Sequence, residues 1–238
     1  IDSPEAARAL VERGWSLFNW LARLPFPTLA LIRGHCMGGG LELALACRYR
    51  IVVDDPSTKL ALPEVMLGIM PAWGGMMRLP RVVGPAVALD MMLTGKPADA
   101  KKAKRTGLAD ECVPARVMEN AADMLVISGR KPRSLSLMAR LMNGPLRSVV
   151  AGKAVKQVEG RARREHYPAP YAIIETWAKH GGNALDVPAD SPASLEAIFR
   201  SPTAKNLVRV FFLQERLKGF GKPAEGAEPF KPRHVHVV

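Results

Sequence analysis

Three consecutive glycines and a nearby glutamate are the part of this sequence best suited to chemistry. Gly38, Gly39 and Gly40 precede an apolar helical stretch, residues 41–47, that contains Glu42. Glycine has no Cβ, so a ligand can approach its backbone closely. The start of a helix also presents N–H groups without partners, which suit a phosphate or a carbonyl oxygen that gains negative charge. The alternative is a tight turn that only packs helix on strand.

Two glutamates can supply acid–base chemistry beside these donors. The neighbours of Glu42 are leucine, alanine and cysteine, and burial raises the pKa of a carboxyl group towards neutrality. The alternative is a surface carboxylate at a helix start, where the dipole favours it. Glu64 follows Pro63 at the end of a predicted strand. The alternative to a functional role for Glu64 is an ordinary carboxylate in a loop. As a pair, one carboxyl would activate water and the other would protonate a carbon beside a thioester carbonyl.

The elements that must position these residues alternate between strand and helix. Ser3, Pro4 and Glu5 are typical of a helix start, and the apolar face that follows continues to Leu21. Strands are predicted over residues 28–33, 49–53, 59–62 and 109–113. Because strands, a glycine-rich turn and helices alternate, we expect an α/β fold with parallel strand pairing.

Beyond Pro114 the pattern is almost entirely helical. Helices are predicted over residues 115–128, 135–141, 149–179, 191–200 and 203–218. Residues 219–233 contain three prolines among glycines and lysines, which is typical of a linker.

Composition and charge exclude several classes of protein. Of the 238 residues, 48% are hydrophobic and 24% are charged, which is typical of globular proteins and excludes general disorder. No run of 18 apolar residues occurs, so we expect no membrane span. The net charge of +12, from 34 basic and 22 acidic residues, suits polyanions or is simply a solvated basic surface. Aromatic residues are not interleaved as a base-stacking platform requires, so we expect no nucleic-acid partner.

The cysteines and histidines indicate neither disulfides nor a metal site. Cys36, Cys47 and Cys112 form no CxxC pair, which is typical of reduced thiols in the cytosol or an organellar matrix, and we expect a cytoplasmic location. The five histidines include no HxxxH pair with a suitably placed carboxylate, so we expect no metal. The chain starts at Ile1 rather than methionine, and we expect it to be a piece of a longer polypeptide.

Several ordered motifs together resemble the crotonase (enoyl-CoA hydratase/isomerase) superfamily. The first is residues 27–44, PTLALIRGHCMGGGLELA. The others are LPEVMLGIMP over 62–71, GGMMRLPR over 74–81, LTGK over 93–96 and AKRTGLAD over 103–110. The helical remainder, especially residues 194–218, is similar to the connecting region of multifunctional fatty-acid oxidation α-chains. In those chains a hydratase domain precedes a 3-hydroxyacyl-CoA dehydrogenase.

The resemblance implies a crotonase-type ββα spiral followed by a mostly helical C-terminal region. We expect residues 1–130 to be a hydratase/isomerase core that lacks its first strands. Residues 131–218 would form the helical and linker region, and 219–238 a flexible linker towards an absent dehydrogenase domain.

The same resemblance implies roles for individual residues. The Gly39 N–H would be an oxyanion-hole donor, Glu42 would activate water, and Glu64 would handle the proton at the α-carbon. The implied reaction is hydration of trans-2-enoyl-CoA to 3-hydroxyacyl-CoA in fatty-acid β-oxidation. The implied substrate-binding residues are Gly38, Gly40, Pro71 and Trp73. Trp73 stands where relatives often carry a small residue, so we expect it to narrow the acyl pocket.

Two departures from the family keep other interpretations open. Residues 1–238 contain no motif of the Ala-Gly-Ala-Asp type, which in the family supplies the second oxyanion donor and part of the CoA site. No GxGxxG follows a strand, so we expect no NAD binding and no cofactor other than the CoA of the substrate. The alternatives are a Δ3-Δ2-enoyl-CoA isomerase or other crotonase reaction, a basic nucleic-acid-binding module, and an inactive fragment or scaffold. Expected partners are an acyl-CoA and either a thiolase subunit or further copies of the chain.

Overall fold

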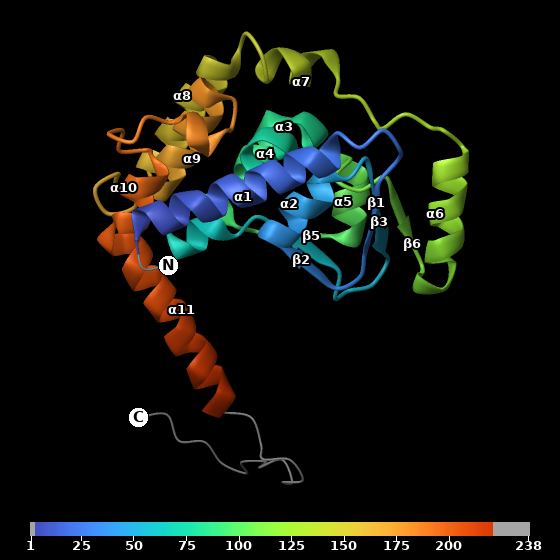
Figure 1. Cartoon of the computed structure of the whole chain (residues 1–238), viewed down its shortest axis with the longest axis horizontal. Helices are drawn as coiled ribbons and strands as arrows, with labels where there is room; N and C mark the ends of the chain where they lie inside the picture. The colour runs from blue at the N-terminus through green and yellow to red at the C-terminus, as the bar shows by residue number, and fades with distance from the viewer. Residues whose placement is uncertain (1–2, 221–238) are drawn as a thin grey trace.

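The computed structural model describes residues 3–220 (Figure 1). The first half of the chain contains α1 (Pro4–Ala22), β1 (Leu29–Ile32), β2 (His35–Met37), α2 (Gly39–Ala46), β3 (Tyr49–Val53), β4 (Lys59–Ala61), the 3-10 helix η1 (Glu64–Leu67), α3 (Gly75–Val83), α4 (Pro85–Thr94), β5 (Ala98–Asp99), α5 (Ala100–Thr106) and β6 (Glu111–Val113). The second half contains η2 (Ala115–Val117), α6 (Met118–Ile127), α7 (Leu137–Met142), α8 (Arg147–Glu159), α9 (Ala169–His180), η3 (Ala184–Asp186), α10 (Leu195–Arg200) and α11 (Pro202–Phe220).

Two small sheets carry the strands of the described residues. One has the order β1-β3-β6 and is parallel throughout, with Leu29 opposite Tyr49 and Ile51 opposite Glu111. The other has the order β2-β4-β5, in which β2 and β4 are parallel and β4 and β5 antiparallel. Parallel pairing in an α/β fold is therefore confirmed, apart from the β5 edge.

The strands and helices repeat as ββα units. β1 and β2 lead to α2, and β3 and β4 lead through η1 to α3, with one strand of each pair in each sheet. β2 was not among the predicted strands. It exists because Gly34, at φ 75°, turns the chain out of β1 and into the second sheet.

The main core lies among α2, α3, α4 and α9 and includes buried residues of strands β1 to β4. All five residues of β3 are buried. Val52 belongs to the main cluster, which also contains the fully buried Met76, Leu79 and Met92. Tyr49 and Ile51 form a second, smaller cluster with residues of α6. Arg50 is the polar exception in β3. Its side chain is neutralised by Asp110 at 3.6 Å and donates to the carbonyl oxygens of Leu108 and Cys47. Backbone carbonyl oxygens and one carboxylate therefore offset the cost of burying this cation.

The C-terminal half is helical, as predicted, but its elements are shorter. The helix predicted over 149–179 is wrong as one element, because residues 160–168 separate α8 from α9. Pro168 and Pro170 have no N–H to continue a helical ladder. Figure 1 shows α8, α9 and α10 gathered at one end of the molecule, α6 at the other, and α11 projecting from the body.

The proposed boundary near residue 130 falls in the extended segment between α6 and α7. The two regions are in contact, since Arg8 of α1 forms an ion pair with Glu196 of α10 at 3.1 Å. The division into regions stays a prediction. The linker predicted over 219–238 lies outside the described residues, except that residues 219 and 220 end α11.

Candidate active site

Glu42 lies in the first turn of α2 and is almost completely buried. The helix starts after Gly38, whose φ of 55° and ψ of −128° only glycine adopts readily. Glu42 is 3% exposed, and its Oε1 accepts the backbone N–H groups of Trp73 at 2.8 Å and Gly75 at 2.7 Å. The expected burial of this carboxyl is confirmed, and the surface alternative is wrong.

Burial raises the pKa of Glu42 to about 7. The two backbone hydrogen bonds and the positive charge of Arg78 act in the opposite direction, because they favour the ionised form. The outcome is a carboxyl group that is part ionised at neutral pH. Such a group can accept a proton from water, because little free energy is needed to ionise it at neutral pH.

Glu64 is the first residue of η1 and faces the glycine turn before α2. Its Oε1 lies so close to Gly38 that a Cβ at that position would be 3.2 Å away. Its Oε2 is buried and has no hydrogen-bond partner among the described residues. Burial, followed by the charge of Glu42, raises the pKa of Glu64 to about 8. An ordinary loop carboxylate is excluded by this environment.

The two carboxyl groups therefore lie at one place, on either side of the glycine turn. Each keeps one oxygen available, because Glu42 uses only Oε1 for its two backbone donors and Glu64 Oε2 is unpaired within residues 3–220. Their raised pKa values allow one group to be ionised while the other is protonated near neutral pH. Such an arrangement has the chemistry that an acid–base pair requires.

Gly39 supplies a backbone N–H beside this pair. As the first residue of α2 it has no intrahelical acceptor, and no other acceptor takes its N–H among the described residues. Gly40 is exposed, and a Cβ there would meet nothing within 4 Å. Pro71 is buried in the segment that connects η1 to α3 and leads directly to Trp73.

The indole of Trp73 rests directly on Gly39. A Cβ on Gly39 would be 2.6 Å from Trp73 Cζ3, and a Cβ on Gly14 would be 2.5 Å from the same indole at Cδ1. Phe18 packs edge-on against it, with ring centroids 5.7 Å apart. Trp73 thus fills the space between α1 and the start of α2. Its expected role in narrowing the acyl pocket stays a prediction.

Arg78 was not singled out from the sequence, although it organises this site. It is 7% exposed in α3, its Nη1 donates to the Trp73 carbonyl oxygen at 3.0 Å, and its Nη2 donates to Asn19 Oδ1. It therefore fixes the loop whose N–H groups hold Glu42. The signal in the sequence was a charged residue among apolar ones, since Arg78 follows Met76 and Met77 and precedes Leu79 and Pro80, and the same kind of signal identified Glu42.

Other chemistries find little support in residues 3–220. No three His, Cys, Asp or Glu side chains lie together there as a metal site would require. Cys36, Cys47 and Cys112 are free thiols. No helix in that part of the chain combines the length and apolar character needed to cross a bilayer.

Comparison with known proteins agrees with this geometry. Residues 3–157 match the family described as enoyl-CoA hydratase/isomerase. The fatty acid oxidation complex subunit alpha of Vibrio campbellii is 42% identical over 98% of the chain, and that of Vibrio cholerae is 46% identical over 73%. These alignments cover 33% and 25% of the two relatives, so the chain spans about a third of the length of the curated relatives it matches.

The fold has solved counterparts. An enoyl-CoA hydratase from Mycobacterium avium subsp. paratuberculosis K-10 superposes with a TM-score of 0.54 and 19% identity, over 87% of this chain and 71% of that one. At this identity the likeness concerns the fold alone. The chain belongs to the enoyl-CoA hydratase/isomerase family.

Proposed function

We propose that the chain adds water reversibly to a trans-2-enoyl-CoA to give a 3-hydroxyacyl-CoA in fatty-acid β-oxidation. One observation carries this proposal. Two buried carboxyl groups, with pKa values raised to about 7 and about 8, flank a helix start whose first N–H has no acceptor within the described residues. Hydration of an enoyl thioester requires a base for water, an acid for the α-carbon and a donor for the thioester oxygen.

Each residue has one role in the proposed reaction. Glu42 takes a proton from water, and the water oxygen bonds to the β-carbon. The π electrons move towards the thioester oxygen, where the Gly39 N–H stabilises the developing negative charge. Glu64, which its raised pKa keeps protonated at neutral pH, then gives its proton to the α-carbon. Transfer of a proton from Glu42 to Glu64 restores the starting state.

The test is to measure hydration and Δ3-Δ2 isomerisation for Glu42→Gln and Glu64→Gln separately. Each substitution should lower the hydration rate by about 100-fold or more, since each removes a general acid or base. Glu119→Gln, an exposed carboxylate on α6, is the matched control and should change neither rate. Hydration that survives in Glu42→Gln would contradict the assignment. Isomerisation by the wild type without hydration would favour the isomerase alternative.

The wider setting of the reaction is part of the same proposal. The curated relatives are named subunits of a fatty acid oxidation complex, which supports a place in a larger multifunctional enzyme that contains a dehydrogenase and a thiolase partner or further copies of the chain. The three free thiols support a cytoplasmic location. Co-purification of the chain, within its full-length polypeptide, with a thiolase is the corresponding test.

A further inference from the structure

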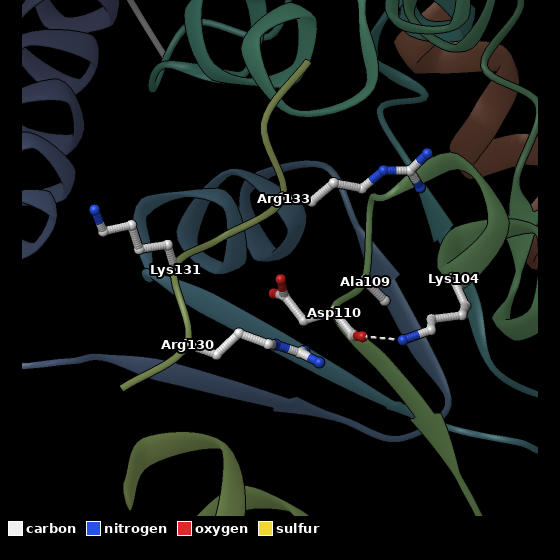
Figure 2. A pocket seen from close by; sticks show the side chains of 6 residues that line it. All are labelled: Lys104, Ala109, Asp110, Arg130, Lys131 and Arg133. Atoms are coloured by element: carbon white, nitrogen blue, oxygen red, sulfur yellow. Dashed lines mark hydrogen bonds between the residues drawn. The ribbon is translucent and has the colours of Figure 1, made fainter. Parts of the chain in front are cut away.

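Two adjoining recesses lie along the segment 129–136, which connects α6 to α7. The first, of about 260 Å³, is lined by Lys104, Ala109, Asp110, Arg130, Lys131 and Arg133 (Figure 2). The second, of about 360 Å³, shares Arg133 and is lined otherwise by Arg81, Ser134, Leu135, Arg140 and Asn143. Both recesses are therefore bordered by cations, and Arg133 belongs to both.

Two of the four cations that line the first recess are neutralised. Glu111 pairs with Lys104 at 2.7 Å and with Arg130 at 2.8 Å. The carboxylate of Asp110 points into the recess in Figure 2, but it is taken by Arg50, whose backbone N–H donates to it at 2.8 Å. An anion entering this recess would meet the Asp110 carboxylate and two cations that are already paired.

The second recess has no such compensation. None of the residues that line it is acidic. Within residues 3–220, no carboxylate lies within 4.0 Å of the side-chain nitrogens of Arg81, Arg133 or Arg140. Burial, followed by the charge of Arg81, lowers the pKa of neighbouring Arg147. Uncompensated cations that line one recess repel one another, and a bound anion would relieve that repulsion.

The segment that carries these arginines is held against the body. The Tyr49 hydroxyl donates to the carbonyl oxygen of Arg130, and Arg133 Nη1 donates to the carbonyl oxygen of Arg105 at 3.2 Å. On the other side of the second recess, Asn143 Oδ1 accepts the indole N–H of Trp177 at 3.2 Å. The segment and Asn143 are therefore positioned before any ligand arrives, which reduces the entropy lost on binding, although the arginine side chains themselves are exposed.

The second recess is separate from the acid–base pair. Arg81 lies in the last turn of α3, whereas Gly75 at the first turn holds Glu42. At 1.5 Å per residue, the six intervening steps place the two about 9 Å apart along the helix axis. No residue of the second recess contacts Glu42 or Glu64 through a hydrogen bond in the described part of the chain.

We propose that Arg81, Arg133 and Arg140 form a binding site for a phosphate group, carried either by a soluble molecule or by a lipid headgroup. The guanidinium fork matches phosphate oxygens in geometry and charge, and Arg133 spends only one of its N–H donors on the body. The Ser134 hydroxyl adds a neutral donor at the edge. The site goes beyond the proposed hydration and does not depend on it.

The test is calorimetric titration of the full chain with inorganic pyrophosphate at low salt. Arg133→Gln and Arg140→Gln should each weaken binding by about tenfold, because each removes a charge-assisted hydrogen bond. Arg140 makes no hydrogen bond through its side chain in the described residues, so its substitution leaves the fold intact. Arg209→Gln on α11 removes the same charge from an exposed helix and should leave binding unchanged.

A second arm separates the two sources of phosphate. Vesicles containing phosphatidic acid are compared with vesicles of phosphatidylcholine alone, using the same three variants. If pyrophosphate binds and the binding weakens in Arg133→Gln and Arg140→Gln, the ligand is a soluble phosphate compound. If only the phosphatidic acid vesicles bind, and the same two variants weaken that binding, the ligand is a lipid headgroup. Absence of both, or an equal loss in Arg209→Gln, would overturn the proposal. Loss of hydration activity alone would leave it intact.

Discussion

Replacement of Glu42 by glutamine should stabilise the folded protein at neutral and alkaline pH, although it removes the proposed base. Glutamine has nearly the same shape, and its amide oxygen can still accept the N–H groups of Trp73 and Gly75. What disappears is the buried negative charge, which costs free energy in the folded state. The substitution therefore tests the electrostatic argument independently of catalysis.

The magnitude follows from the pKa of Glu42. Burial raises that pKa from 4.5 to about 7, and each unit corresponds to about 1.4 kcal/mol. Below about pH 4 the carboxyl is protonated in both states, so it has no effect on the pH dependence of stability. As the pH rises towards about 8, the unfolded chain ionises more readily than the folded one, and wild-type stability falls by about 3 kcal/mol through this group. The glutamine variant lacks that fall.

Urea unfolding followed by circular dichroism, at several values between about pH 5 and pH 8, measures this difference. The free energy of unfolding of Glu42→Gln minus that of the wild type should increase with pH. The charge of Glu42 also raises the pKa of Glu64. Part of the expected increase in the free energy of unfolding therefore comes from the removal of the repulsion between the two carboxylates. Glu119→Gln is the control for loss of an exposed carboxylate. Parallel pH curves for Glu42→Gln and wild type would refute the reasoning.

Two further substitutions test the surroundings of the pair. Gly39→Ala should lower the free energy of unfolding by about 1–3 kcal/mol, because the added Cβ would lie 2.6 Å from Trp73. Gly40→Ala is the control, because a Cβ there meets nothing within 4 Å, and it should leave the free energy of unfolding unchanged. Equal urea midpoints for the two variants would contradict this prediction. Arg78→Gln should shift the acidic limb of the pH–rate profile for hydration to higher pH, because the Arg78 charge lowers the pKa of Glu42 and the variant lacks that charge. An unshifted limb would show that Arg78 acts only as a structural support.

Part of the site was predictable because local sequence patterns report burial. Glu42 stands among leucines and alanines in a helix without a polar face, so its neighbours favoured burial and a raised pKa, and the structure then excluded the surface alternative. The start of α2 was equally evident, because glycines after an apolar strand permit the backbone conformation seen at Gly38. The parallel pairing of β1 and β3 followed from the strand and helix alternation between them.

The tertiary structure alone decided which distant residues meet. That Glu64 lies against Gly38, that Trp73 covers Gly39, and that Arg133 and Arg81 share one recess depends on how the ββα units stack and on the path of the 129–136 segment. Periodicity and propensity describe each element by itself, and they carry no information on contacts between residues far apart in the chain. The sequence by itself thus determined the chemical groups and their burial, whereas the packing of the elements determined their partners.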